Sequence, residues 1–191
     1  PFVEGAIRGL FLTHRDAPAK SVLNDLVTSS APTGWREQEG KVTRLEVSGA
    51  GPVCCTVEVD KELAEDYRYT KRYDFFPSHF LVTTQVNKPL CYSRAFYLAE
   101  GEYLDDKGLR ATVDGKGDAE GIAGSNVKPQ WYQFTGEGWA HSCVAITPFG
   151  NVSYWDGWGQ IGFTDAKELP CRVGYVVHPA APSERFGAED A

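Results

Sequence analysis

Residues that could act as acids, bases or anion-binding groups gather in one short stretch, YRYTKRYDFF at 67–76. Successive side chains of an extended chain point to opposite faces, so Tyr69 and Tyr73 share one face and Arg68 and Arg72 share the other. Exposed rings can lie under sugars, and arginine can hold a carboxylate through two hydrogen bonds. The alternative is that the rings are core and the charges are solvated.

Two histidines and three tryptophans extend this set of candidates. His141 in WAHSC and His79 after Pro77 could act as acid or base, because imidazole titrates near neutral pH. Tryptophans in QWYQFTGEGWAHS and YWDGWGQ lie beside glycine, polar or acidic residues, which makes Trp139, Trp155 and Trp158 candidates for ligand contact. Core packing is the alternative for each of them.

Metal and cofactor motifs are missing from the sequence. No histidine or cysteine spacing is typical of a transition-metal site. The glycine-rich loop DGKGDAEG departs from a full calcium-binding loop, and no phosphate-binding or dinucleotide fingerprint occurs. We therefore expect neither a metal nor a cofactor.

Length and composition indicate a single globular domain. The 191 residues contain 42% hydrophobic and 24% charged residues, and the net charge is −7, which argues against a nucleic-acid partner. No apolar run is long enough to span a membrane, and the first twenty residues lack the pattern of a signal peptide. The five cysteines form no regular disulfide framework, so buried thiols are expected, with one or two disulfides as the alternative.

Hydrophobic periodicity predicts an all-β protein. From residue 42 onward, short runs rich in β-branched and aromatic residues alternate with turn residues, and DDKG at 105–108 joins two of them. This pattern predicts an antiparallel β-sandwich of roughly ten strands. Few short helices are expected, at 17–30, where apolar residues repeat at helical spacing, and at 60–67. We predict one domain over 1–191, with an irregular or helical lead-in at 1–40 and a tail at 180–191.

The order of strands carries a partial resemblance to a known family. SGAGPV leads into a strand of alternating valines, and a strand rich in tyrosine and arginine and then HFLVTTQV follow. This quarter of the chain resembles the β-sandwich modules, similar to the galactose-mutarotase-like supersandwich, of polysaccharide lyases and glycoside hydrolases. The resemblance implies tyrosine or histidine as base and acid and arginine, histidine or asparagine against a uronate carboxylate, types that Tyr73, His79, Arg72 and His141 supply. The chain is short for a full supersandwich, which implies an ancillary module of a larger chain.

These observations lead to one main functional hypothesis and two alternatives. The main one is a secreted or periplasmic β-sandwich that binds a polysaccharide or oligosaccharide, an acidic one in particular, and cleaves it by β-elimination if it is an enzyme. Tyr73 or His141 would then be the base. The alternatives are a structural or interaction module without catalysis, and a small barrel with an apolar ligand in its lumen.

The sharpest expectation concerns Arg72. We expect Arg72 and one of the neighbouring tyrosines to lie at the rim of a concave sheet face together with Trp139 or His141. Arg72→Lys should then weaken binding of acidic ligands, because lysine keeps the charge but loses the two-point contact, and should change stability by about 0.5 kcal/mol or less. Unchanged affinity in a binding titration would favour the alternative, in which the rings of 67–76 are core and the charged side chains are solvated.

Overall fold

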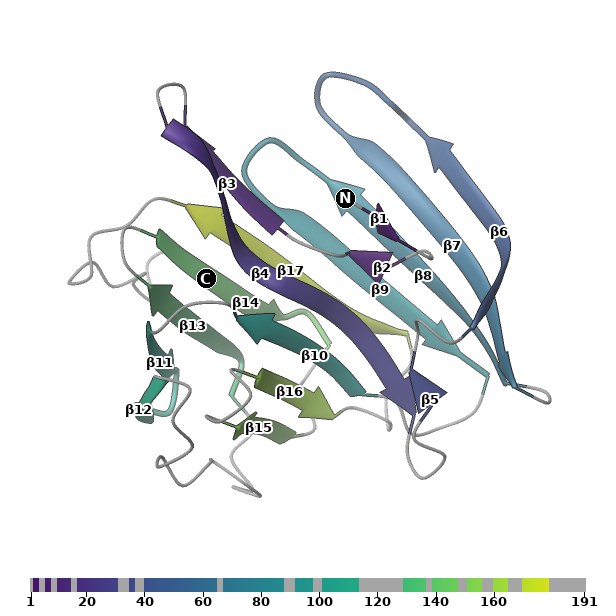
Figure 1. Cartoon of the computed structure of the whole chain (residues 1–191). Helices are drawn as coiled ribbons and strands as arrows, with labels where there is room; N and C mark the ends of the chain where they lie inside the picture. Colours follow the sequence, from purple (N-terminus) through teal and green to yellow (C-terminus); the bar gives the residue numbers. More distant parts are fainter. Residues whose placement is uncertain are drawn as a thin grey trace.

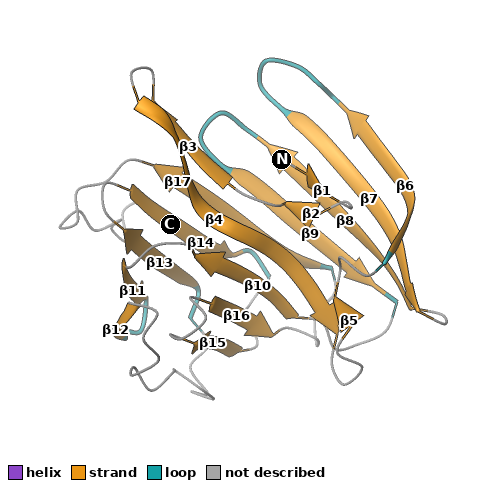
Figure 2. Ribbon diagram, viewed as in Figure 1, coloured by secondary structure: helices purple, strands orange, loops and turns teal. Residues whose placement is uncertain are grey.

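The computed structural model describes residues 40–64, 67–87, 101–113, 129–136, 139–147 and 170–178, and in addition the backbone of the strands outside these ranges. Side chains are described for residues 40–62, 68–87, 101–112, 129–136, 140–147 and 170–176. The described residues contain strands and turns and no helix, so the prediction of an all-β antiparallel sandwich is confirmed (Figure 2). Within the described residues, no helix is long and apolar enough to cross a membrane.

Two antiparallel sheets make up the fold, and the smaller one is drawn in front of the larger one in Figure 1. The smaller sheet has eight strands in the order β1-β2-β4-β10-β16-β15, with β3 and β5 paired to β4. Its strands are β1 (Phe2–Val3), β2 (Ala6–Ile7), β3 (Leu10–His14), β4 (Ala17–Ser30), β5 (Trp35–Arg36), β10 (Tyr92–Tyr97), β15 (Asn151–Trp155) and β16 (Gln160–Thr164).

The larger sheet has nine strands in the order β12-β11-β13-β14-β17-β9-β8-β7-β6. Its strands are β6 (Lys41–Ser48), β7 (Cys55–Ala64), β8 (Tyr67–Phe75), β9 (Phe80–Val86), β11 (Gly101–Asp105), β12 (Arg110–Val113), β13 (Trp131–Gly136), β14 (Trp139–Ala145) and β17 (Cys171–His178). Among the described pairings β12 and β6 are its two edges and do not pair with each other, so the sheet is open. The alternative of a closed barrel is therefore wrong.

Two expected helices are strands in the structure. The segment 17–30 forms β4, and of the segment 60–67 the described residues 60–64 belong to β7 and Tyr67 begins β8. In β4 the register shifts where it pairs with β3 and again where Phe96 and Tyr97 of β10 pair with Asp25 and Leu23. Each inserted residue interrupts the alternation of a strand. The apolar residues of this strand therefore repeat at a spacing that is typical of a helix. The lead-in at 1–40, predicted as irregular or helical, contains β1 to β5.

One face of the nine-stranded sheet carries most of the buried side chains that the structure describes. The buried apolar residues of β7, β8 and β9 recur at every second position, as shown by Val59, Tyr73 and Val82, each 5% exposed or less. These positions lie in register across the sheet, because Val57 pairs with Tyr73 and Tyr73 with Val82. The alternation that predicts the strands thus also selects the face that is buried.

The predicted turn at 105–108 is confirmed and shows how the short hairpin is held. Gly108 has a φ of 82°, a left-handed conformation that glycine adopts without strain, and its amide donates to the carbonyl of Asp105 at 3.0 Å. The Asp105 carboxylate accepts from the amides of Lys107 and Leu109 at 2.9 and 3.1 Å. The side chain that begins the turn therefore satisfies the backbone that follows it.

Packing between β11 and β13 yields a stability prediction. A Cβ at Gly101 would overlap the carbonyl oxygen of Thr135 and would lie 2.6 Å from Cε1 of Phe134. Gly101→Ala should therefore lower the free energy of unfolding by about 1–3 kcal/mol, the usual cost of overpacking. Gly174→Ala is the matched control, because its Cβ would make an ordinary contact at 3.5 Å with Leu81. Denaturant unfolding that ranks the two variants equally would contradict this packing argument.

Candidate functional site

The two faces of β8 lie in different environments. Tyr69 and Tyr73 are 2% and 0% exposed, so their rings lie in the interior, whereas Arg68 and Arg72 lie on the opposite, solvent-facing side. The prediction that the tyrosines lie at the rim of an open face is therefore wrong for Tyr69 and Tyr73. Alternation assigned both sets to their faces correctly, but it could not tell which face another layer would cover. The side chain of Tyr67 lies outside the described residues.

Cross-strand ring contacts continue from Tyr73 over much of the buried face. The chain of neighbouring rings crosses β8, β9, β17, β14, β13 and β11, with centroid separations of 5.0–6.4 Å, and its members are Tyr73, Phe75, Phe80, Tyr175, His141, Tyr132 and Tyr103. We call this set the ring ladder. Separations of this size are typical of favourable aromatic pairs.

His141 lies inside the ring ladder and is fully buried. It stacks on Tyr175 at 5.3 Å and meets Tyr132 edge-on at 6.4 Å. Burial lowers the pKa of His141 to about 3, because the charged imidazolium loses its hydration. The imidazole is therefore neutral at physiological pH, and the rings of Tyr175, Phe80 and Phe75 separate it from Tyr73 along the ladder.

Two buried lysines interrupt the apolar side chains of the same face. Lys61 and Lys71 are 1% and 0% exposed, and Nζ of Lys71 lies 5.5 Å from the ring centroid of Tyr73. A cation at that distance is attracted by the negative face of the ring. Lys71, which breaks the aromatic pattern of the sequence, is thus accommodated inside the sandwich next to the ring that follows it on its face.

Arg72 is held by its own strand. Its guanidinium donates to both carboxylate oxygens of Asp74 at 2.9–3.0 Å, and Thr56 donates to the same carboxylate at 2.6 Å. Partial burial alone would raise the pKa of Asp74, but the hydrogen bonds from Arg72 and Thr56 lower it below its usual value. Because Arg72 is on the face opposite His141, the expected grouping of these two residues is wrong. Arg72→Lys should then disturb the contact with Asp74 and not a ligand.

The other predicted residues are spread over the chain. His79 stacks on Phe76 at 4.7 Å and lies 3.0 Å from the hydroxyl of Ser78, in the turn between β8 and β9. Trp139 and Trp155 lie on β14 and β15, but their side chains are outside the described residues, as is all of Trp158. Cys54, Cys55, Cys143 and Cys171 are thiols and not disulfides, and burial raises the pKa of Cys143. Cys91 lies outside the described residues.

A hollow of about 520 Å³ opens on the solvent-facing side of the strands β6 to β9. Its polar lining, from four neighbouring strands, comprises Thr43, Asp60, Glu62, Arg68, Thr70, Gln85 and Asn87. The remaining lining residues, Lys61, Tyr69 and Val86, form one cross-strand row whose buried side chains belong to the other face, so this row is the floor. Of the predicted site residues, Arg68 and Tyr69 are part of the hollow.

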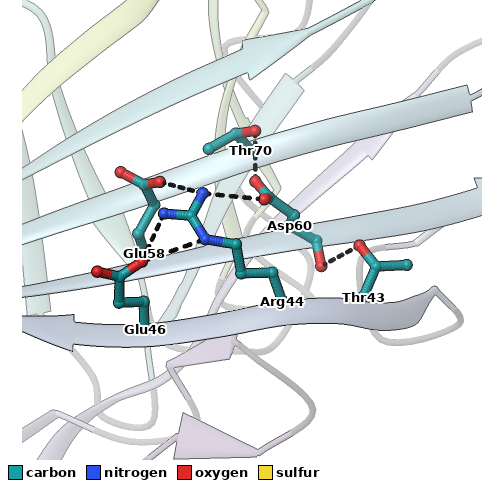
Figure 3. A network of polar contacts seen from close by, with 6 residues as sticks. All are labelled: Thr43, Arg44, Glu46, Glu58, Asp60 and Thr70. Atoms are coloured by element: carbon teal, nitrogen blue, oxygen red, sulfur yellow. Dashed lines mark hydrogen bonds and ion pairs between the residues drawn. The ribbon is translucent and has the colours of Figure 1, made fainter.

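Hydrogen bonds fix the polar groups of this hollow. Oδ1 of Asp60 accepts from Thr70 at 2.6 Å, and its backbone carbonyl accepts from Thr43 at 3.1 Å (Figure 3). The side-chain oxygen of Asn87 accepts from the amide of Arg68 at 2.9 Å, and the amide of Asn87 donates to the carbonyl of Arg68 at 3.2 Å. The guanidinium of Arg68 contacts Glu62 at 3.3 Å. Sequence reasoning missed Gln85 and Asn87. The sequence marks them only as polar residues two positions apart at the end of a strand.

A metal site is not indicated in the part of the chain that the structure describes. Its histidine, cysteine and carboxylate side chains form no group of three or more that could hold a metal ion. Comparison with known proteins finds no protein-family model that matches the chain and no curated protein that matches its sequence. The function must therefore be argued from the geometry of the described residues.

The buried imidazole makes stability depend on pH. In the unfolded chain His141 binds a proton below about pH 6.5, whereas in the folded protein it does so only near pH 3. Between these values the unfolded state holds more protons, so the free energy of unfolding should fall as the pH is lowered, by at most about 1.4 kcal/mol per unit from this group. Urea titrations of the protein and of His141→Leu at several pH values test this, since the variant should have a flatter profile. Parallel profiles would show that His141 is accessible to protons when folded.

Proposed function

We propose that the protein is a saccharide-binding β-sandwich and that its ligand lies in the hollow on β6 to β9. The observation that carries this proposal is the density of fixed hydrogen-bonding groups around a sheet floor: hydroxyls of Thr43 and Thr70, amides of Gln85 and Asn87, and the charged groups of Asp60, Glu62 and Arg68. Sugar hydroxyls are donors and acceptors at once, and this lining offers both kinds of partner. The volume lies within the range of small-ligand sites.

The charges of the lining favour an uncharged saccharide over the acidic one that the sequence suggested. The hollow is lined by two basic residues, Arg68 and the buried Lys61 of its floor, and by two carboxylates, Asp60 and Glu62, so neither sign of charge dominates. Arg68 already contacts Glu62, and a uronate would have to displace that carboxylate while approaching the other. A neutral sugar needs no such exchange.

Binding without cleavage fits the arrangement better than β-elimination. The proposed base of a lyase has to reach the proton next to the carboxylate. Tyr73 and His141 are 0% exposed and belong to the face that the second layer covers, whereas the hollow is on the other face. A lyase would have to use groups other than these two.

Gln85 provides the sharpest test of the hollow. It is exposed on β9, and its side-chain amide donates to the carbonyl of Val86 at 3.3 Å. Gln85→Ala should weaken binding of a neutral oligosaccharide, identified on a glycan array, by about tenfold, as expected for the loss of one or two hydrogen bonds. Isothermal titration calorimetry measures this effect.

Thr83→Ala is the matched control, because Thr83 lies on the same strand and the same face but outside the hollow. It should leave the affinity unchanged. An array with no neutral saccharide bound, or an equal loss in both variants, would contradict the proposed site. Binding only of uronate sugars, lost in Arg68→Ala, would restore the acidic preference.

A further inference from the structure

The strand β6 is an edge of the nine-stranded sheet, and its apolar side is not covered. Among the described strands it pairs only with β7, and it lies at the outer edge of the sheet in Figure 1. Leu45 and Val47 are both 60% exposed, and Val42 is 38% exposed. Their partners on β7 include Val59 and Val57, which are buried. The apolar face of the sheet thus continues onto β6 beyond the region where side chains are covered.

Proteins usually protect such an edge, and β6 does so only at its beginning. Lysine and a β-bulge discourage pairing with another chain, and β6 has Lys41 and a register shift between Val42 and Arg44. From Arg44 to Ser48 its register with β7 is regular. This half of the strand combines an unpaired edge among the described strands with exposed apolar side chains, which favours the addition of a strand.

We propose that β6 pairs in antiparallel fashion with β6 of a second copy of this protein, with the two-fold axis at Leu45. The two nine-stranded sheets would then continue into each other. Leu45 of each copy would meet its equivalent on the apolar side, and Arg44 of each copy would lie opposite Glu46 of the other on the polar side.

Charge selects this register among the alternatives. If the apolar side chains of both copies are to stay on one face, the two-fold axis must pass through a residue and not between two residues. The alternative registers therefore have their axis at Arg44, Glu46 or Val47 in place of Leu45. An axis at Arg44 would place two guanidinium groups opposite each other, and an axis at Glu46 would do the same with two carboxylates. An axis at Val47 would place Glu46 opposite Ser48 and forfeit the ion pairs. Of these four axes, the one at Leu45 places opposite charges across from each other in both copies.

The charges involved already belong to one network within each copy (Figure 3). Arg44 contacts Glu46 and Glu58 at 2.7 Å and Asp60 at 3.2 Å, so three carboxylates share one guanidinium. Arg44 and Glu46 are 48% and 54% exposed, which leaves both accessible from the edge. In the paired arrangement each Glu46 lies between two guanidinium groups, and the networks of both copies join.

Sedimentation velocity of the whole chain over a series of concentrations tests this pairing. The protein should convert from monomer to dimer with a dissociation constant on the order of micromolar, as befits a small interface built on one strand. Glu46→Arg and Arg44→Glu each place like charges opposite each other in the paired strands. Each variant alone should dimerise about tenfold more weakly or worse.

Mixing provides the decisive measurement. An equimolar mixture of Glu46→Arg with Arg44→Glu restores both complementary pairs, so heterodimers should form where neither variant associates alone. The double variant R44E/E46R should regain self-association, and Val53→Lys, an exposed valine outside β6, should leave it unchanged. Glu46→Arg leaves two cations beside the two remaining carboxylates, Glu58 and Asp60, and should fold, which circular dichroism verifies.

Three results would overturn the pairing: a monomeric protein at every concentration, equal dimerisation of Glu46→Arg and the unmodified chain, or a mixture without heterodimers. Glu46 does not line the hollow, whereas Arg44 contacts the lining residue Asp60, so saccharide binding by Glu46→Arg is the independent measurement. The pairing can fail while the saccharide site stands, and the reverse holds as well.

Discussion

Burial of one face of the nine-stranded sheet is the constraint on which the other features depend. The ring ladder joins β8 to β11 through aromatic contacts between neighbouring strands, and these contacts depend on the register of the strands. A shift of a strand by one residue would move its rings to the solvent side and its charges into the interior. For β8 this would bury Arg72 and expose Tyr73, so the register of this strand follows from which of its faces is covered.

Polar groups are then concentrated on the opposite face. Arg44, Glu58, Asp60, Arg72 and Asp74 are neighbours across β6, β7 and β8, and they satisfy one another in short ion pairs and hydrogen bonds. Pairs of this kind at a surface contribute little to stability. Of these five residues Asp60 lines the hollow, and its contact with Arg44 helps to fix its side chain there. The core therefore organises the site indirectly, by forcing polar side chains outward at known positions.

The sequence predicts the elements well and the exposed surface poorly. Alternation in VTRLEVS, YRYTKRYDF and FLVTTQV identifies β6, β8 and β9 and assigns their two faces, because a strand has a fixed period of two. It does not identify β4, where inserted residues break the period of two and the apolar spacing predicts a helix. It also could not decide which face of β8 would be covered, since tyrosine suits both a core and a sugar site. Gln85 and Asn87 join the hollow only through the pairing of β9 with β8, a contact between strands that a local pattern does not contain.

The hollow spans β6 to β9 and the uncovered edge is β6, so the two proposed sites are neighbours on the sheet. A two-fold axis perpendicular to the sheet keeps equivalent faces on the same side, so pairing at Leu45 would place two hollows on one continuous polar surface. A long saccharide with repeating units could then contact both, and the second contact would be intramolecular and so far less dependent on concentration. Pairing through β6 would in this way raise the affinity of the two hollows together above that of either one alone.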